Sequence, residues 1–316
     1  MAFASLLGNE RLKQNLQITL SRGHISHFYL ISGPEGSGRH TLARLLAAAI
    51  LCREKDAPCL RCNTCRKVME NTHPDFITVD DPEKKTVPVD LIRQARADIY
   101  IQPNESEHKI YLFPRAQDMG IPSQNALLKI LEEPPKYGVF ILLTNNPEQL
   151  LPTVRSRCTP LSLQPLAEPV LADALKAEFP KASPEDIASA IMRSAGFLGQ
   201  AKKVLENGAT LPVQVQSLAE GFAAKDACQL LAALAPMEKW KRDQLIPVLQ
   251  QFLELLEGSL ACRAGIPGNA LAQHIGRQRS SQDLMQAISH LQKALEYAQG
   301  NVSVGAICGY ICWHLR

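Results

Sequence analysis

The chain lacks the features that would place it in a membrane or outside the cell. No apolar run reaches the roughly 18 residues of a membrane span, and residues 1–8 lack the basic start and long apolar centre of a secretory signal. The chain also lacks a large excess of one charge, because its 34 Lys and Arg residues and 31 Asp and Glu residues give a net charge of only +3. We therefore expect a cytoplasmic protein without a membrane segment, whose nucleic-acid contacts are local or shared with partners.

The composition is that of an ordinary globular protein. The 316 residues, 46% hydrophobic and 21% charged, suffice for two or three domains that each bury a core. Short apolar runs alternate with helical patterns over about the first 165 residues. The runs cover 28–32, 76–79, 110–113, 139–144 and 160–163. This alternation predicts an α/β fold in which helices cover both faces of a parallel sheet.

Beyond residue 168 the strand signal disappears and only helical patterns remain. Pro165–Pro169 marks the first predicted domain boundary, and Asn207–Pro212, with its glycine and proline, marks the second. We predict three domains, at residues 1–166, 167–208 and 209–316.

A glycine-rich loop follows the first expected strand and precedes a helical pattern. It reads Gly33-Pro-Glu-Gly-Ser-Gly-Arg39-His40-Thr41, close to the phosphate-binding pattern G-x-x-x-x-G-K-[ST]. Arg39 replaces the lysine that reaches the terminal phosphates, and His40 replaces the hydroxyl that holds Mg²⁺, for which imidazole is a poor ligand. Thr41 comes one residue late, which on a helix turns its side chain by about 100°. The candidate residues of this altered nucleotide cradle are Gly33, Gly36, Gly38, Arg39, His40 and Thr41; a plain tight turn is the alternative.

The second half of an ATPase site is altered too. After the expected strand at 108–113, a P-loop enzyme carries an acidic residue for Mg²⁺ and usually another that activates water. This chain has Pro114-Arg115 there, and neither can hold a metal or take a proton. Losses in two separate motifs predict that the nucleotide fold is kept and that ATP is not hydrolysed by this chain, whereas nucleotide binding stays open.

Four of the nine cysteines are clustered. Cys52, Cys59, Cys62 and Cys65 follow the spacing C-x6-C-x2-C-x2-C, and four thiolates suit a closed, tetrahedral Zn²⁺ site. We predict a structural zinc, against a redox pair or small apolar side chains as alternatives. Four further cysteines are expected to pack as small apolar side chains, namely Cys228, Cys262, Cys308 and Cys312.

Five sequence segments form a specific combination: Leu7–Glu10, His27–Pro34, the four-cysteine insert, Asn125–Pro135 and Ser156–Cys158. Together they resemble the bacterial clamp-loader family of AAA+ proteins, which serves DNA polymerase III. The likeness is dense over about the first 165 residues and reduces to helical character in the last hundred. It implies a P-loop AAA+ domain with a zinc module at about 52–65, a small helical lid domain and an all-α collar domain.

The resemblance also implies roles for single residues. Arg157 matches an arginine finger that reaches ATP held by a neighbouring motor subunit; Arg155 is a possible substitute, and an ordinary surface ion pair is the alternative. The turn at 194–200 has no arginine where the family contacts ATP from the lid, although Arg193 lies just before it. Thr144 and Asn145 match a phosphate sensor or, equally well, a strand-end cap.

These residues favour a non-hydrolysing clamp-loader subunit. The resemblance implies gamma or tau motor subunits, a clamp-opening delta subunit, the sliding clamp and primer-template DNA as partners, with DNA contacts to the backbone. The alternatives are an active motor of the gamma or tau type with Arg39 in place of lysine, and a zinc-dependent nucleic-acid-binding module or thiol redox enzyme built on residues 52–65.

Overall fold

The computed structural model describes residue 3 and residues 5–180, 182–206, 211–265, 270–300 and 302–315. The chain divides into two compact units, residues 1–206 and 207–316, and each is described by itself. The second predicted boundary falls largely on residues 207–210, which lie outside the described residues.

The first unit is built on a parallel sheet. Its strands pair in the order β2-β3-β4-β1-β5, and every pair is parallel. The predicted parallel α/β sheet is therefore confirmed, and each predicted run lies within two residues of a strand. The strands in the described residues are β1 (Phe28–Ser32), β2 (Phe76–Thr78), β3 (Lys109–Phe113), β4 (Gly138–Thr144) and β5 (Thr159–Ser162).

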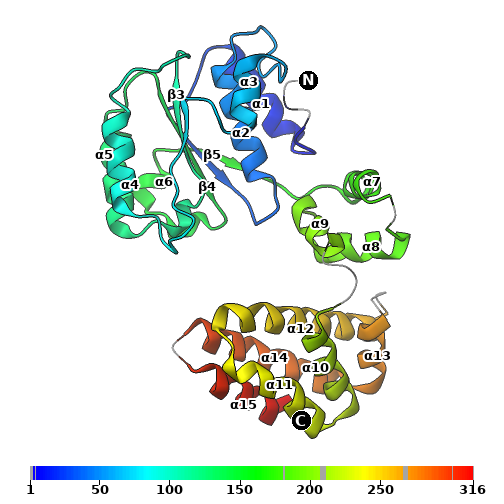
Figure 1. Cartoon of the computed structure of the whole chain (residues 1–316). Helices are drawn as coiled ribbons and strands as arrows, with labels where there is room; N and C mark the ends of the chain where they lie inside the picture. Colours follow the sequence, from blue (N-terminus) through cyan, green and yellow to red (C-terminus); the bar gives the residue numbers. More distant parts are fainter. Residues whose placement is uncertain are drawn as a thin grey trace. The chain divides into compact units, whose positions relative to one another are not determined.

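Both faces of this sheet are buried, as the continuous apolar strands require. Alternate residues such as Tyr29 and Ile31 pack on one helical layer, while Phe28 and Leu30 pack on the other. The first layer contains α1 (Glu10–Ser21), α2 (Arg39–Leu51) and α3 (Asn63–Met69). The opposite layer contains α4 (Val89–Asp98), α5 (Ile121–Glu132) and α6 (Pro152–Arg155) (Figure 1).

Helices alone follow the last strand among the described residues. The first unit ends with α7 (Glu168–Glu178), α8 (Pro184–Arg193) and α9 (Leu198–Glu206), which share a small core around Leu171, Leu175 and Ile187. The described part of the chain also contains three short 3-10 turns, η1 (Ala116–Asp118), η2 (Pro147–Gln149) and η3 (Ala235–Lys239). The second unit contains α10 (Val213–Ala224), α11 (Ala227–Leu234), α12 (Arg242–Arg263), α13 (Ala270–Gln278), α14 (Ser281–Gln299) and α15 (Val304–Leu315).

One of these helices, α12, is long and apolar enough to cross a membrane by length and composition. Its inner side, however, carries Leu245, Leu249 and Phe252, which are fully buried in the core of the second unit. Packing inside the unit therefore accounts for its apolar composition.

The packing role predicted for the scattered cysteines is mostly met. Cys308 is buried, and Cys262 and Cys312 pack against the core of the second unit. The expectation is wrong for Cys228, which is exposed. Cys228 lies in the first turn of α11, where its backbone N–H is bound by the capping side chain of Asp226 and its thiol lies outside the core.

A buried carboxylate ties the beginning of β2 to the segment that leads into β3. Asp75 is fully buried and accepts backbone hydrogen bonds from Asn104 (2.6 Å), Glu105 (2.8 Å) and Ser106 (2.9 Å). Burial by itself raises the pKa of Asp75, but the three N–H donors favour the charged form and hold its pKa below the usual value.

Replacing this carboxylate, Asp75→Asn, is expected to lower the stability of the first unit by about 2–3 kcal/mol at pH 7, because charge-assisted bonds are lost. The native contribution is fully present above the unfolded pKa of about 4 and is lost as the pH falls through the lowered folded pKa. Denaturant unfolding at pH 7 and at pH 3 should therefore show a gap between native and variant chains that narrows in acid. An equal gap at both pH values would contradict this role of Asp75.

Candidate functional site

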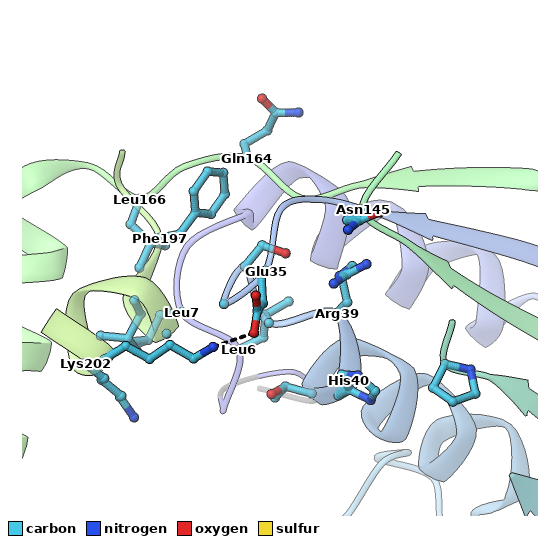
Figure 2. A pocket seen from close by; sticks show the side chains of 18 of the residues that line it. Leu6, Leu7, Glu35, Arg39, His40, Asn145, Gln164, Leu166, Phe197 and Lys202 are labelled. Atoms are coloured by element: carbon cyan, nitrogen blue, oxygen red, sulfur yellow. Dashed lines mark hydrogen bonds and ion pairs between the residues drawn. The ribbon is translucent and has the colours of Figure 1, made fainter. Parts of the chain in front are cut away.

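A cavity of about 650 Å³ lies at the carboxyl edge of the sheet, between the glycine loop and α9. Figure 2 shows Arg39 and Glu35 pointing into it, with Asn145 at one side and Phe197 and Lys202 at the other. Strand ends, the loop and the helical segment after residue 167 all contribute to its walls. The residues predicted for the nucleotide cradle are thus brought together around one space, except that Gly33 lies at the base of the loop behind it.

The loop has the backbone shape of a phosphate cradle. Gly36 and Gly38 have φ angles of +77° and +95°, which residues with a side chain rarely adopt. Gly38 precedes the first turn of α2, whose N–H groups have no acceptor within the helix, and residues 39–41 of that turn line the cavity. At the base of the loop the N–H of Gly33 donates to the carbonyl of Thr144 (3.2 Å), which fastens it to β4. A helix N-terminus aimed into a cavity favours an anion.

The two substituted positions differ in charge. Arg39 is half-buried, which lowers its pKa from a very high value without removing its charge. Its Nη1 and the hydroxyl of Ser37 are buried and make no hydrogen bond within the described residues. Loss of water around the ring and the charges of Arg39 and Arg44 lower the pKa of His40, so this imidazole is neutral at pH 7. The start of α2 therefore offers one cation and no oxygen ligand at the His40 position.

Arg115 is held by a carboxylate that the sequence reasoning did not find. Its Nη2 donates to Asp80 (2.7 Å), and its Nε donates to the same carboxylate (3.0 Å). It also donates to two backbone carbonyls and lies 3.8 Å from the carboxylate of Asp118. These hydrogen bonds and the charge of Asp80 raise the pKa of Arg115 further. Asp80 follows β2, which is the neighbour of β3 in the sheet. The carboxylate of Asp80 thus lies near the expected metal position, but it is already paired with the guanidinium of Arg115.

The loop is also in direct contact with α9. The N–H of Gly199 donates to the carbonyl of Gly36 (2.9 Å), the amide of Gln200 donates to the carbonyl of Glu35 (3.0 Å), and the Glu35 carboxylate pairs with Lys203. The Lys203 hydrogen bond and charge hold the pKa of Glu35 below its usual value. A Cβ atom at Gly199 would lie 2.6 Å from the Cα of Gly36, so the two backbones touch.

The cations that reach the cavity from the helical segment are lysines. Lys202 and Lys203 line it, whereas Arg193, at the end of α8, is not among its lining residues. The turn between α8 and α9 is built instead for close packing, because Gly196 has a φ of +84° and its carbonyl accepts from Leu166 (2.8 Å). The family pattern pointed to an arginine within residues 194–200 and so gave no indication of Lys202 and Lys203, which follow directly in α9.

The predicted sensor residues have different environments. Thr144 is fully buried, and its hydroxyl accepts from the N–H of Asn146 (3.1 Å), which is the geometry of a strand-end cap. Asn145 is exposed and lines the cavity.

The four clustered cysteines meet at the junction of α2 and α3. Their sulfur atoms all lie within 4.8 Å of one another, with Cys52 to Cys62 at 4.0 Å and Cys59 to Cys65 at 3.9 Å. Four sulfurs at about 2.3 Å from a tetrahedral Zn²⁺ are about 3.8 Å apart, so the residues fit that ion. Backbone N–H groups of Arg61 and Cys62 lower the pKa of Cys59 to about 6, which favours its thiolate. The cluster could bind a metal ion.

The turn at Ser156–Cys158 extends α6 at the surface. Arg157 is exposed, and its Nη1 donates to the carbonyl of Thr153 (3.0 Å). Arg155 is paired with the Glu148 carboxylate. Of the two arginines, Arg157 is the one whose guanidinium is not held by a carboxylate within the described residues.

The fold and the glycine loop define an α/β protein with a nucleotide-type cradle, and comparisons with known proteins narrow the class. The family described as DNA polymerase III, delta subunit, matches residues 8–167, half of the chain. The chain belongs to this family of clamp-loader subunits.

Individual relatives include proteins named as tau and as delta' subunits of DNA polymerase III. The tau subunit of Bacillus subtilis is 30% identical over 265 residues, covering 76% of this chain and 47% of that protein. The delta' subunit of the same organism is 34% identical over 166 residues, covering 52% and 50%. Both relatives are about twice as long as the region they share with this chain. A gamma subunit-related protein of Thermotoga maritima superposes with a TM-score of 0.49 at 18% identity, covering 96% of this chain and 99% of that one.

Removing metal from the cysteine cluster is expected to destabilise the first unit, because a structural site contributes its binding energy to folding. Treatment with a strong chelator should release the bound metal and lower the midpoint of thermal unfolding by roughly 10 °C. Cys59→Ser should have the same effect, while Cys228→Ser, which changes an exposed thiol outside the cluster, should have none. Full zinc content in Cys59→Ser, measured by atomic spectroscopy, would contradict the site.

Substitution of Gly199 by alanine tests the contact between the loop and α9. A methyl group there meets the Gly36 backbone, so the variant should lose about 1–3 kcal/mol through overpacking, although alanine favours helix. Hydrogen exchange at residues 198–206 should become faster. Gly309→Ala, in α15 with nothing within 4 Å of the added Cβ, is the control and should be neutral or slightly stabilising. Unchanged exchange in Gly199→Ala would mean that the contact is dispensable.

Proposed function

We propose that this chain is a non-hydrolysing subunit of the DNA polymerase III clamp loader, of the delta prime type. The observation that carries the proposal is the Asp80–Arg115 pair beside the loop. Hydrolysis needs a carboxylate that is free to bind Mg²⁺ and a group that accepts a proton from water. Here the nearby carboxylate is neutralised by a guanidinium, and the hydroxyl position of the loop holds the neutral imidazole of His40.

In this proposal Arg157 serves a neighbour's site. A guanidinium that enters a dry subunit boundary stabilises the charge that develops on the transferred phosphate. Arg157 suits that role because it is exposed at the end of α6 and its contact with a backbone carbonyl is easily exchanged. The chain would thereby control ATP cleavage that it does not itself perform.

The remaining assignments follow from the same proposal. Residues 1–166 form the AAA+ domain, with Cys52, Cys59, Cys62 and Cys65 holding a structural zinc. Residues 167–208 form the lid, and residues 209–316 form one part of an oligomeric collar. The partners are gamma or tau motor subunits, the delta subunit, the sliding clamp and the backbone of primer-template DNA, in the cytoplasm.

A second candidate is an active motor of the gamma or tau type. The similarity to a tau subunit and the cations Arg39, Lys202 and Lys203 around the cavity favour it. It requires Asp80 to leave Arg115 and bind Mg²⁺. Steady turnover of Mg-ATP by the purified chain would support the motor and exclude the non-hydrolysing subunit.

Replacing Arg157 by alanine is the direct test of the proposed role. In the reconstituted clamp loader, Arg157→Ala should abolish the share of ATP turnover that comes from the adjacent site, since such a residue contributes on the order of 10³ or more in rate. Assembly should be unchanged, because the side chain is exposed. ATP hydrolysis is measured with clamp and primed DNA present.

The control is Arg93→Ala, which removes another exposed arginine, one that pairs with Asp90 on α4. It should leave turnover as it is, and the isolated native chain should show none. A complex with Arg157→Ala that hydrolyses ATP at the native rate would remove Arg157 from the mechanism.

A further inference from the structure

A buried amide lies under the turn that carries Arg157. Gln124, in the first turn of α5, is 3% exposed. Its Nε2 donates to the carbonyls of Met119 (2.9 Å) and Gln149 (3.1 Å), and its Oε1 accepts from the N–H of Leu151 (2.7 Å). Both donor hydrogens and the acceptor are thus used, each by a backbone group. A buried amide satisfied in this way fixes the position of every segment that it touches.

The three partners belong to two different connections. Met119 follows η1, in the segment that comes after β3 and contains Arg115. Gln149 ends η2, in the segment after β4, and Leu151 is the residue that precedes α6. Gln124 therefore joins the connection after β3 to the start of the helical turn that leads to Arg157.

That turn has few other restraints at its start. The helix α6 has only four residues, and no side chain caps its N-terminus. The buried Val154 and Cys158 hold its inner side against the core. These apolar contacts are non-directional and leave rotation of the turn less restricted than a hydrogen bond does. The N–H of Leu151 bonds outside the turn, to Gln124, whereas its carbonyl accepts from Val154 and Arg155 inside the turn. The turn has one further directional contact, the pair between Arg155 and Glu148.

We propose that Gln124 is a positioning residue: by fixing Leu151 it sets the direction in which Arg157 leaves the surface. This inference rests on the proposed function of Arg157 at a neighbour's site. The distance from Leu151 to Arg157 is six residues, so a small rotation at the start of α6 displaces the guanidinium by an ångström or more. A misplacement of about 1 Å in a group that acts on a transition state costs on the order of 10²-fold in rate.

The same helix provides a matched comparison. Ser123 is also buried, and its hydroxyl donates to the carbonyl of Val87 (2.9 Å), in the connection before α4. Loss of that bond removes a buried hydrogen bond from α5 without touching α6. A purely structural role would make Gln124 and Ser123 equivalent.

The experiment measures ATP turnover by the reconstituted clamp loader with clamp and primed DNA. Gln124→Leu should lower about 10- to 100-fold the share of kcat that comes from the adjacent site, while KM for ATP stays within about twofold, because the finger acts on the transition state. Ser123→Ala should change neither value by more than about twofold. Combining Gln124→Leu with Arg157→Ala should give no further loss beyond Arg157→Ala alone, because one residue acts through the other.

A second variant removes the N–H group and leaves Gln124 in place. Leu151 has φ −55° and ψ 138°, which proline adopts, and its N–H is the group bound by Gln124. Leu151→Pro should therefore reproduce the kcat loss even if Gln124→Leu does not assemble, with Leu151→Ala as the control for the lost side chain. This variant also should show no added effect on top of Arg157→Ala.

The outcomes separate the two proposals. If Arg157→Ala lowers turnover but Gln124→Leu and Leu151→Pro match their controls, the positioning role is wrong and the proposed function stands. Losses that multiply with that of Arg157→Ala also overturn the positioning role, since they act elsewhere. If Arg157→Ala has no effect, the proposed function fails and the inference falls with it.

Discussion

The candidate site exists because five parallel strands end at the same edge of a sheet that is buried on both faces. Four of these strands deliver different groups to that edge: the glycine loop after β1, Asp80 after β2, Arg115 after β3 and Asn145 after β4. The two helical layers prevent the strands from shifting, because any slip would expose one apolar face. Every distance described at the cavity depends on this register.

Two carboxylates near the loop are paired with cations of the protein itself. Arg115 neutralises Asp80, and Lys203 neutralises Glu35, so the two carboxylates near the loop are paired. The contact between Gly36 and Gly199 joins the loop to α9 through backbone atoms alone. The loop is thus held from both sides by contacts within the protein.

The sequence predicted much of this fold, and its limits have physical causes. Strands such as 28–32 and 139–144 were identified because buried parallel strands are continuously apolar, and the cysteine cluster because metal ligands have short, regular spacing. Strand order is a long-range property, however, so no local pattern indicated that Asp80 lies beside Arg115. The Glu35–Lys203 pair joins residues 168 positions apart and was equally hidden. Cys228 was misjudged because hydrophobic neighbours do not reveal which side of a short helix faces solvent.

The pair formed by Asp80 and Arg115 also restricts how this chain can evolve. Exchange of Arg115 for an acidic residue would place two carboxylates together without a cation. Exchange of Asp80 would leave the half-buried guanidinium with only the more distant carboxylate of Asp118, at 3.8 Å. A descendant that regained a metal site would have to pass through one of these destabilised intermediates. The ion pair would therefore act as a barrier to the formation of a metal site at this edge of the sheet.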